Sequence, residues 1–322
     1  MVSCDDVSAP VPVKQSGPAR ARRMRVKAPP LAEAAGGSAL LSLLKFAGAK
    51  WWVHEKVPHL LPEPANVTAY REPFCGTIAV GTKYLGKVPC VISDAYAPLI
   101  AMYEGVRADP LAVRAQLLEL VGAHFAAESR EEQQAHYYGI RDDFNQSISA
   151  SAVRRAAWMI YLNRTCYNGL QRVNLKKGEF NVPVGKYKSV SVPSEATFLA
   201  WSAALKDATL SACDFMKTIF LVVRGAFYFL DSPYVAASKS ANFTNYSGVF
   251  GPKEQAALAE SLSEIDAGGA RFMLTNSAMA RPLYEGRWNI LEVGVDRSIS
   301  CKVGQRAKAK EIVVTNYADL CL

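Results

Sequence analysis

We expect an α/β fold with a parallel sheet, because two short apolar runs each end in an acid and a third run ends in a small-residue turn. Residues 227–230 precede Asp231, and residues 91–93 precede Asp94. Continuous apolar runs of this length are typical of buried parallel strands. Open α/β sheets bind ligands just beyond the carboxyl ends of their strands, so these endings mark the expected ligand site.

Length and charge limit the class of protein. A chain of 322 residues allows one large domain with an insertion, or two smaller domains. The net charge of +8 indicates affinity for polyanions, although a merely soluble basic protein has the same composition.

The cysteines, histidines and hydropathy indicate a metal-free cytoplasmic protein. The seven cysteines are scattered without a C-x-x-C pair, which favours a reducing interior over a disulfide framework. The four histidines show no metal-site spacing, so we expect no metal. We also expect no membrane contact, since no run of eighteen apolar residues and no apolar signal core occur.

The N-terminal stretch differs in composition from the rest. Residues 1–38 are rich in Pro, Ala, Gly and Ser and carry a basic cluster at 20–27, which predicts a disordered basic tail. That cluster either touches nucleic acid nonspecifically or is simply solvated. Ordered structure should begin near Leu40, with a helix through Trp51 that ends before Pro58.

A small-residue loop follows the first predicted strand. Residues 72–76 read EPFCG, and small residues allow the backbone to approach a bound cofactor. We expect a helix after this loop. Asp94 ends the next strand, where it either bonds ribose hydroxyls or caps the helix that starts near Ala97.

The region from 109 to 164 is helical rather than alternating. Its apolar spacing predicts three consecutive helices, which interrupt the strand–helix rhythm and indicate an insertion or a second subdomain. The segment 154–188 then carries eight basic residues against one acid, Glu179. Interleaved with aromatic and amide side chains, they suit phosphate contacts and base reading, or else form a solvated face.

The C-terminal third returns to strands and helices. We expect a short strand within 207–214, an amphipathic helix over 252–262 and a strand over 272–276. A helical stretch over 282–288 and two final strands, 289–295 and 311–317, complete the pattern.

The turn after the central strand suggests chemistry on an amino group. The carboxylate of Asp231 and the main-chain carbonyl of Ser232 can accept the two hydrogens of an exocyclic amine, and the ring of Tyr234 can stack on a base. The alternative is a purely structural strand-to-helix turn in which Pro233 fixes the bend.

Several stretches together resemble the Dam-type DNA adenine N6-methyltransferases over residues 43 to 317. They are LLKFAGAK at 43–50, YLNRTCYNGLQRVN at 161–174, GEFNVPVGKYK at 178–188, DSPY at 231–234, SANFTNY at 240–246 and RSIS at 297–300. The resemblance implies a Rossmann-like methyltransferase sheet, mostly parallel with an antiparallel last strand, and a helical DNA-recognition insertion. It places the catalytic domain at 39–104 and 206–322, and the target-recognition insertion at 105–205.

The resemblance also implies roles for individual residues. S-adenosylmethionine is the implied cofactor, bordered by Phe46, Lys50, Pro73, Phe74, Gly76, Asp94 and Asp231. The implied catalytic residues are Asp231, Ser232, Pro233 and Tyr234. The implied DNA contacts are Lys45, Tyr167, Asn168, Leu170, Arg172 and Pro183. The implied partner is double-stranded DNA with a GATC-like site, as in restriction-modification. The implied protein is a monomer in the cytoplasm of a bacterial or phage-infected cell, associated with the nucleoid.

Two of the departures from the family pattern lie in the catalytic tetrapeptide and in the glycine loop. Ser232 stands where the family usually has Pro, which keeps the carbonyl but loosens the turn. Ile78 stands where a second Gly is usual, and its branched side chain is expected to crowd the cofactor. The leading hypothesis is an active adenine N6-methyltransferase. The alternatives are a DNA-binding protein with a decayed cofactor pocket, and a methyltransferase acting on cytosine N4 or on RNA.

Overall fold

A computed structural model of the chain describes residues 40–46, 48–146, 149–174, 176–235, 250–295 and 309–318. The predicted tail at 1–38 and the stretches 240–246 and 297–300 lie outside the described residues. None of the helices in the described ranges is long and apolar enough to cross a membrane.

A seven-stranded sheet forms the centre of the molecule. Its strands run in the order β5-β2-β1-β6-β7-β9-β8. All pairs from β5 to β7 are parallel, while β9 runs antiparallel to both of its neighbours. The bounds are β1 Tyr70–Glu72, β2 Cys90–Asp94, β5 Thr209–Ala212, β6 Phe227–Leu230, β7 Arg271–Ser277, β8 Asn289–Val295 and β9 Ala309–Thr315. The predicted mostly parallel sheet with an antiparallel last strand is confirmed.

The helices fall into two groups along the chain. Those associated with the strands are α1 Trp51–Lys56, α2 Ala97–Ala108, α7 Phe215–Ile219 and α8 Pro252–Ala267. Between β2 and β5 lie α3 Pro110–Ala126, α4 Arg130–Gln146, α5 Ala152–Thr165 and α6 Glu195–Leu205, together with a small hairpin of β3 Val173–Asn174 and β4 Glu179–Phe180. The three consecutive helices predicted over 109–164 are therefore present as α3, α4 and α5.

Two predicted helices are wrong and are replaced by 3-10 turns. The chain after the small-residue loop forms only Gly81–Lys83, because Gly86 takes a left-handed φ of 71° and Pro89 leads directly into β2. The expected helix over 282–288 is the 3-10 segment Ala278–Leu283, which contains Pro282. Proline lacks the backbone N–H that continues a helix, so the turn does not extend.

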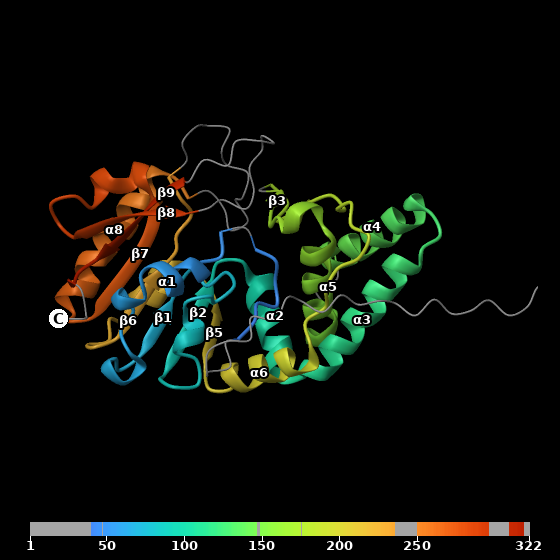
Figure 1. Cartoon of the computed structure of the whole chain (residues 1–322), viewed down its shortest axis with the longest axis horizontal. Coiled ribbons are helices and arrows are strands. Elements are labelled where there is room, and N and C mark those ends of the chain that lie inside the picture. The colour runs from blue at the N-terminus through green and yellow to red at the C-terminus, as the bar shows by residue number, and fades with distance from the viewer. Residues whose placement is uncertain are drawn as a thin grey trace, which may run out of the picture.

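The two halves of the molecule meet along α2. In Figure 1 the strands β7, β8 and β9 lie at one side and α3, α4 and α5 at the other, with β5 and α2 between them. Helix α2 packs against β5 and also against α5 and α6. The insertion boundaries at 105 and 205 stay a prediction.

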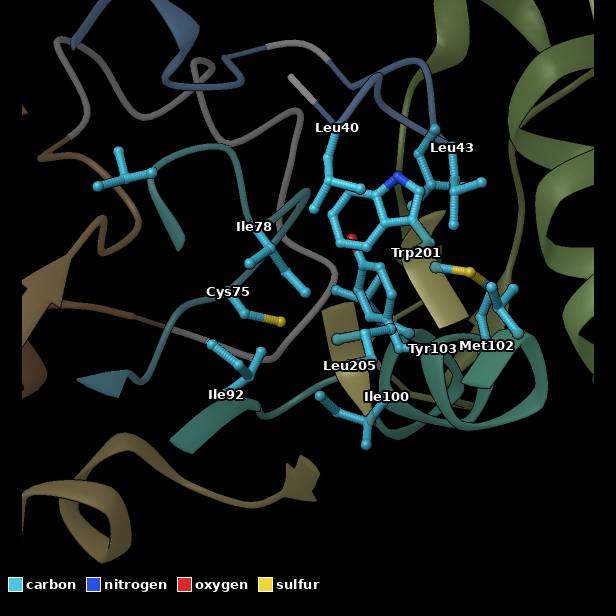
Figure 2. Packing of buried hydrophobic residues seen from close by; sticks show 14 of the residues in the cluster. Leu40, Leu43, Cys75, Ile78, Ile92, Ile100, Met102, Tyr103, Trp201 and Leu205 are labelled. Carbon is cyan, nitrogen blue, oxygen red and sulfur yellow. The ribbon is translucent and has the colours of Figure 1, made fainter. Parts of the chain in front are cut away.

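Buried side chains cover both faces of the central strands. Phe227 and Phe229 of β6 face one cluster, and Tyr228 and Leu230 face the other. Alternate residues of a strand point to opposite faces, so a strand covered on both sides becomes continuously apolar. Figure 2 shows part of the larger cluster, including the Trp201 ring, whose Nε1 donates to a backbone carbonyl of the N-terminal segment at 2.8 Å.

Candidate active site

Three acids lie at the carboxyl ends of three adjacent parallel strands. Glu72 ends β1, Asp94 ends β2, and Asp231 follows β6, which pairs with β1 on its other side. Glu72 is a site residue that sequence reasoning missed, although its position directly before Pro73 marked it as a strand ending. It is only 2% exposed, it accepts a hydrogen bond from Tyr70 Oη at 2.9 Å, and burial raises its pKa well above the usual range.

The Asp231 carboxylate is held through one of its two oxygens. Oδ1 accepts from Lys50 Nζ at 3.0 Å and from Thr275 Oγ1 at 2.8 Å. The side chain remains 23% exposed. Burial raises the pKa of Asp231, and the charge of Lys50 is the largest influence that lowers it. Within the described residues nothing donates to Oδ2, so this oxygen is available to a ligand.

Lys50 is the residue just before α1, and its side chain contacts more than the carboxylate. Its Nζ also donates to the carbonyl of Gly48 at 2.7 Å and lies 4.8 Å from the centre of the Tyr234 ring. The expected cofactor-bordering lysine thus contacts two residues of the predicted catalytic turn. Phe46, its companion in that prediction, is half-buried against the larger core cluster.

The Tyr234 side chain is anchored at its hydroxyl. Tyr234 Oη donates to Glu311 Oε2 at 2.7 Å, and Glu311 comes from the antiparallel strand β9. Burial raises the pKa of Tyr234 well above its usual range, and the negative charges of Asp231 and Glu311 raise it further. Glu311 was not predicted, because its distance of 77 positions from Tyr234 leaves no local signal.

A backbone N–H of the small-residue loop donates to the side-chain carboxylate of Asp94. Asp94 Oδ2 accepts from Gly76 N at 3.2 Å, and Oδ1 accepts from Tyr96 N at 2.9 Å. Asp94 is 3% exposed, and burial raises its pKa to about 6. Gly76 has φ of 45°, and a Cβ at this position would project into open space. Phe74 of this loop stacks on Phe215, with ring centres 5.3 Å apart.

Ile78 adopts a conformation that suits glycine. Its φ is 53°, in the left-handed region where a β-branched residue is an outlier. The side chain is fully buried in the larger core cluster and lies against Gly81, where a Cβ would come within 2.4 Å of its Cγ2. Replacing the family glycine by Ile78 therefore strains the backbone at this position.

The predicted DNA-contacting residues gather from three separate stretches. Tyr167 is 52% exposed, its N–H donates to the carbonyl of Pro183 at 2.8 Å, and the next residue, Asn168, has φ of 55°. Leu170 is half-buried, and Pro183 is exposed. Arg172 donates from Nε to Asn181 Oδ1 at 2.7 Å.

Lys45 is joined to this group through a buried amide. Asn163 accepts from Lys45 N at 2.6 Å and donates to Lys45 O at 2.9 Å. A Cβ on Gly169 would meet the same carbonyl at 2.7 Å, so the glycine permits this close approach. The Lys45 side chain is exposed, with Nζ 4.5 Å from the centre of the Tyr187 ring.

One of the eight basic residues of the 154–188 segment has an internal role. Arg164 donates to the carbonyls of Leu43, Ser42 and Ser191 at 2.9, 3.2 and 2.9 Å. Burial lowers its pKa to about 10. Arg164 therefore binds the chain before α1 to the helical insertion. One fewer positive charge of this segment is left to face phosphates.

The fold and the site define a Rossmann-like methyltransferase, with an acid-Ser-Pro-Tyr turn beside a small-residue loop and a separate basic, helical region. The model of the D12 class N6 adenine-specific DNA methyltransferase family matches residues 46–299. The chain is 36% identical to the type II methyltransferase M.MjaIII of Methanocaldococcus jannaschii, over 85% of this chain and 98% of that protein. It is 31% identical to the DNA adenine methylase of Haemophilus influenzae, over 84% and 91% respectively.

The chain belongs to the D12 class N6 adenine-specific DNA methyltransferase family. The resemblance predicted from the sequence is confirmed, as are the enzyme class and the adenine-specific methylation of DNA. The family implies a methyl donor and a DNA substrate. Among the described residues, no group of three His, Cys, Asp or Glu side chains is arranged to hold a metal.

Proposed function

We propose that the protein transfers the methyl group of S-adenosylmethionine to N6 of an adenine that is flipped out of duplex DNA. The observation that carries this proposal is the Asp231 carboxylate, which Lys50 and Thr275 hold by Oδ1 while Oδ2 remains available. S-adenosylmethionine supplies an electrophilic methyl group when bound. The reaction forms an N6–C bond, breaks the S–C bond and releases one amino proton.

The residues at the ends of β1 and β2 fit this methyl donor. A substituent on Gly76 would enter open space, so the loop leaves room for a ligand against its backbone. Asp94 lies at the edge of the same loop with one backbone N–H on each oxygen. A carboxylate offers about four acceptor positions, so Asp94 retains capacity to bind ribose hydroxyls. Pro73, Phe74 and Phe46 complete the proposed donor site.

The catalytic turn provides what an amino group needs for attack. An exocyclic purine amine is a poor nucleophile inside the duplex, and flipping the base costs roughly a few kcal/mol. Asp231 Oδ2 and the Ser232 carbonyl accept the two amino hydrogens and raise electron density on N6, while the Tyr234 ring stacks on the base. Pro233 fixes the turn, and alignment of the bound reactants supplies much of the acceleration.

The helical region and the segment before α1 provide the proposed DNA contacts. We assign base and backbone contacts to Lys45, Tyr167, Asn168, Leu170, Arg172 and Pro183, five of which lie on the loop and hairpin that follow α5. Besides Arg164 and Arg172, the six other lysines and arginines of 154–188 are half-buried or exposed, and one of them, Lys177, pairs with Glu179 at 3.9 Å. Such charges neutralise phosphates and position the duplex. We propose that a monomer in the cytoplasm is sufficient, because donor and DNA sites lie on one chain.

Substitution of the catalytic carboxylate tests the proposal. Asp231→Ala and the near-isosteric Asp231→Asn should each lower the methyl-transfer rate by on the order of a hundredfold or more, while DNA affinity stays close to the wild-type value. Asp207→Ala is the matched control. Asp207 is exposed and precedes β5, so it lies near the amino end of a parallel strand, whereas Asp231 follows the carboxyl end of β6. Equal loss of transfer and DNA binding in both Asp231 variants would show that Asp231 is structural.

A further inference from the structure

Two buried side-chain amides hold the catalytic turn from outside it. Gln255 lies in the first turn of α8, and Asn276 lies near the end of β7. Gln255 is 4% exposed, Asn276 is fully buried, and Ser232 beneath them is 2% exposed. Buried amides must be hydrogen-bonded to avoid a desolvation cost, so their partners show what they hold in place.

The two amides bond to three successive parts of the turn. Gln255 Nε2 donates to the carbonyl of Pro233 at 2.7 Å, and Asn276 Oδ1 accepts from Val235 N at 3.2 Å. Asn276 Nδ2 lies 3.5 Å from Ser232 Oγ. The amides are also joined to each other, since Asn276 Nδ2 donates to Gln255 Oε1 at 3.3 Å.

The two carbonyls of the turn differ in their hydrogen bonding. The Pro233 carbonyl is occupied by Gln255, and among the described residues no group donates to the Ser232 carbonyl. The proposed function requires the Ser232 carbonyl as an acceptor for the adenine amine. The amide pair thus fixes the orientation of the two peptide groups on either side of Tyr234 and contacts the Ser232 side chain, while the Ser232 carbonyl next to Asp231 stays available.

We propose that Gln255 and Asn276 are positioning residues that compensate for a serine at position 232, where a second proline would otherwise stiffen the turn. The inference rests on the proposed role of the Ser232 carbonyl. A proline at this position would restrict φ directly, whereas serine leaves the chain more conformations to lose. Tertiary hydrogen bonds from α8 and β7 supply that restriction instead.

Single-turnover methyl transfer with saturating S-adenosylmethionine and duplex DNA tests the role of Gln255. Gln255→Met keeps the size of the side chain, removes its hydrogen bonds and leaves the Pro233 carbonyl unpaired. We expect a transfer rate roughly ten- to a hundredfold lower, with unchanged DNA affinity. Ser261→Ala is the matched control, because Ser261 is a buried polar residue of α8 that bonds Ala257 O and Met216 Sδ, away from the turn.

A double-variant cycle separates positioning from general stability. Ser232→Pro should reduce the loss caused by Gln255→Met to about threefold or less, because the turn no longer depends on the amide. Equal losses in the two backgrounds would overturn the inference, as would a rate loss that follows the melting temperature in the same way for Ser261→Ala and Gln255→Met.

Hydrogen exchange of the backbone amides of residues 231–235 gives a readout that does not depend on activity. Gln255→Met and Asn276→Leu should raise exchange in this segment, and Ser261→Ala should not. If the wild-type protein transfers no methyl group to adenine, the proposed function fails while this exchange difference still reports the positioning. Unchanged exchange in both variants would refute the positioning itself.

Discussion

At the residue level, burial and the charge of Lys50 have opposite effects on the pKa of Asp231. Burial raises the pKa of Asp231, and the Lys50 ammonium group at 3.0 Å lowers it. The proposed mechanism needs the ionised carboxylate of Asp231, so activity should fall as pH drops through this pKa. Lys50→Met removes the opposing charge and raises the pKa further, so the acid limb of the pH–rate profile should move to higher pH.

The conservative variant provides the control for this shift. Lys50→Arg retains a positive charge near Oδ1 and should leave the acid limb close to its wild-type position, even if the rate falls. The measurement is the single-turnover transfer rate across the acid range. Identical acid limbs for Lys50→Met and the wild type would contradict a role for Lys50 in keeping Asp231 ionised.

Ile78 provides a stability prediction that depends on backbone conformation. A left-handed φ costs a residue with a side chain about 1–2 kcal/mol and costs glycine little. Ile78→Ala loses the buried side chain and keeps that cost, whereas Ile78→Gly loses the side chain and relieves it. The glycine variant should therefore be the more stable of the two by about 1 kcal/mol in urea unfolding.

Ile92 supplies the matched comparison. It is fully buried in β2, a regular strand, where glycine is less stable than alanine by about 0.5–1 kcal/mol. The order of the two variants should thus reverse between positions 78 and 92. The same order at both positions would show that the left-handed conformation of Ile78 carries no strain.

Residue types revealed part of the site from the sequence alone. Asp94 and Asp231 were predicted because an acid that ends an apolar run is visible locally. Glu311 and Gln255 were not, because their contacts to the catalytic turn span 77 and 22 positions, and only the folded sheet brings them together. Whether Asp94 binds ribose stays a prediction. The alternative, that Asp94 is the N-cap of α2, is wrong, because Tyr96 occupies that position and, of the described N–H groups at the start of α2, Asp94 accepts only from that of Tyr96.

At the scale of elements, the β3–β4 hairpin carries the arginine with the clearest proposed recognition role. Arg172 lies just before β3, and Asn181 lies just after β4. Arg172 Nε donates to Asn181 Oδ1. Guanidinium groups read guanine through two parallel hydrogen bonds, each good pair being worth roughly 1–3 kcal/mol of discrimination. Arg172→Ala should therefore relax sequence preference at one position of the site.

Comparison with a lysine of the same hairpin distinguishes base reading from phosphate contact. Lys176 is exposed in the turn between the strands, so Lys176→Ala should weaken binding evenly across DNA sequences and reduce its salt dependence. The measurement is methylation and binding across a set of singly altered duplexes. An even loss for Arg172→Ala as well would assign Arg172 to the phosphate backbone.

The elements that the sequence predicted well are those with long or unmixed patterns. β6 was visible as four apolar residues because it is covered on both faces, and α3 to α5 were visible through their helical periodicity. The 3-10 turns at Gly81–Lys83 and Ala278–Leu283 were predicted as helices, because their first residues are compatible with a helix. Glycine and proline near their ends keep them short. That Arg164 binds backbone carbonyls could not be predicted, because its partners lie 27 to 122 positions away in the chain.

Across the whole protein, the segment before α1 contacts both the helical region and the turn that begins at Asp231. Arg164 and Asn163 bind the segment before α1 to the helical region, and this segment continues into Lys50, which pairs with the carboxylate of Asp231. Lys45 and Lys50 are therefore separated by only five positions, one at the proposed DNA contact and the other in the site. If both proposed roles hold, one short stretch of backbone carries a DNA contact and a residue of the catalytic site.

The most direct test is transfer of labelled methyl from S-adenosylmethionine to unmethylated duplex DNA, with the modified positions read by sequencing. We expect N6-methyladenine within one short motif, and no label on duplexes in which that adenine is replaced. Modified cytosine, or no transfer while S-adenosylmethionine and DNA still bind, would contradict the role assigned to Asp231 and its turn.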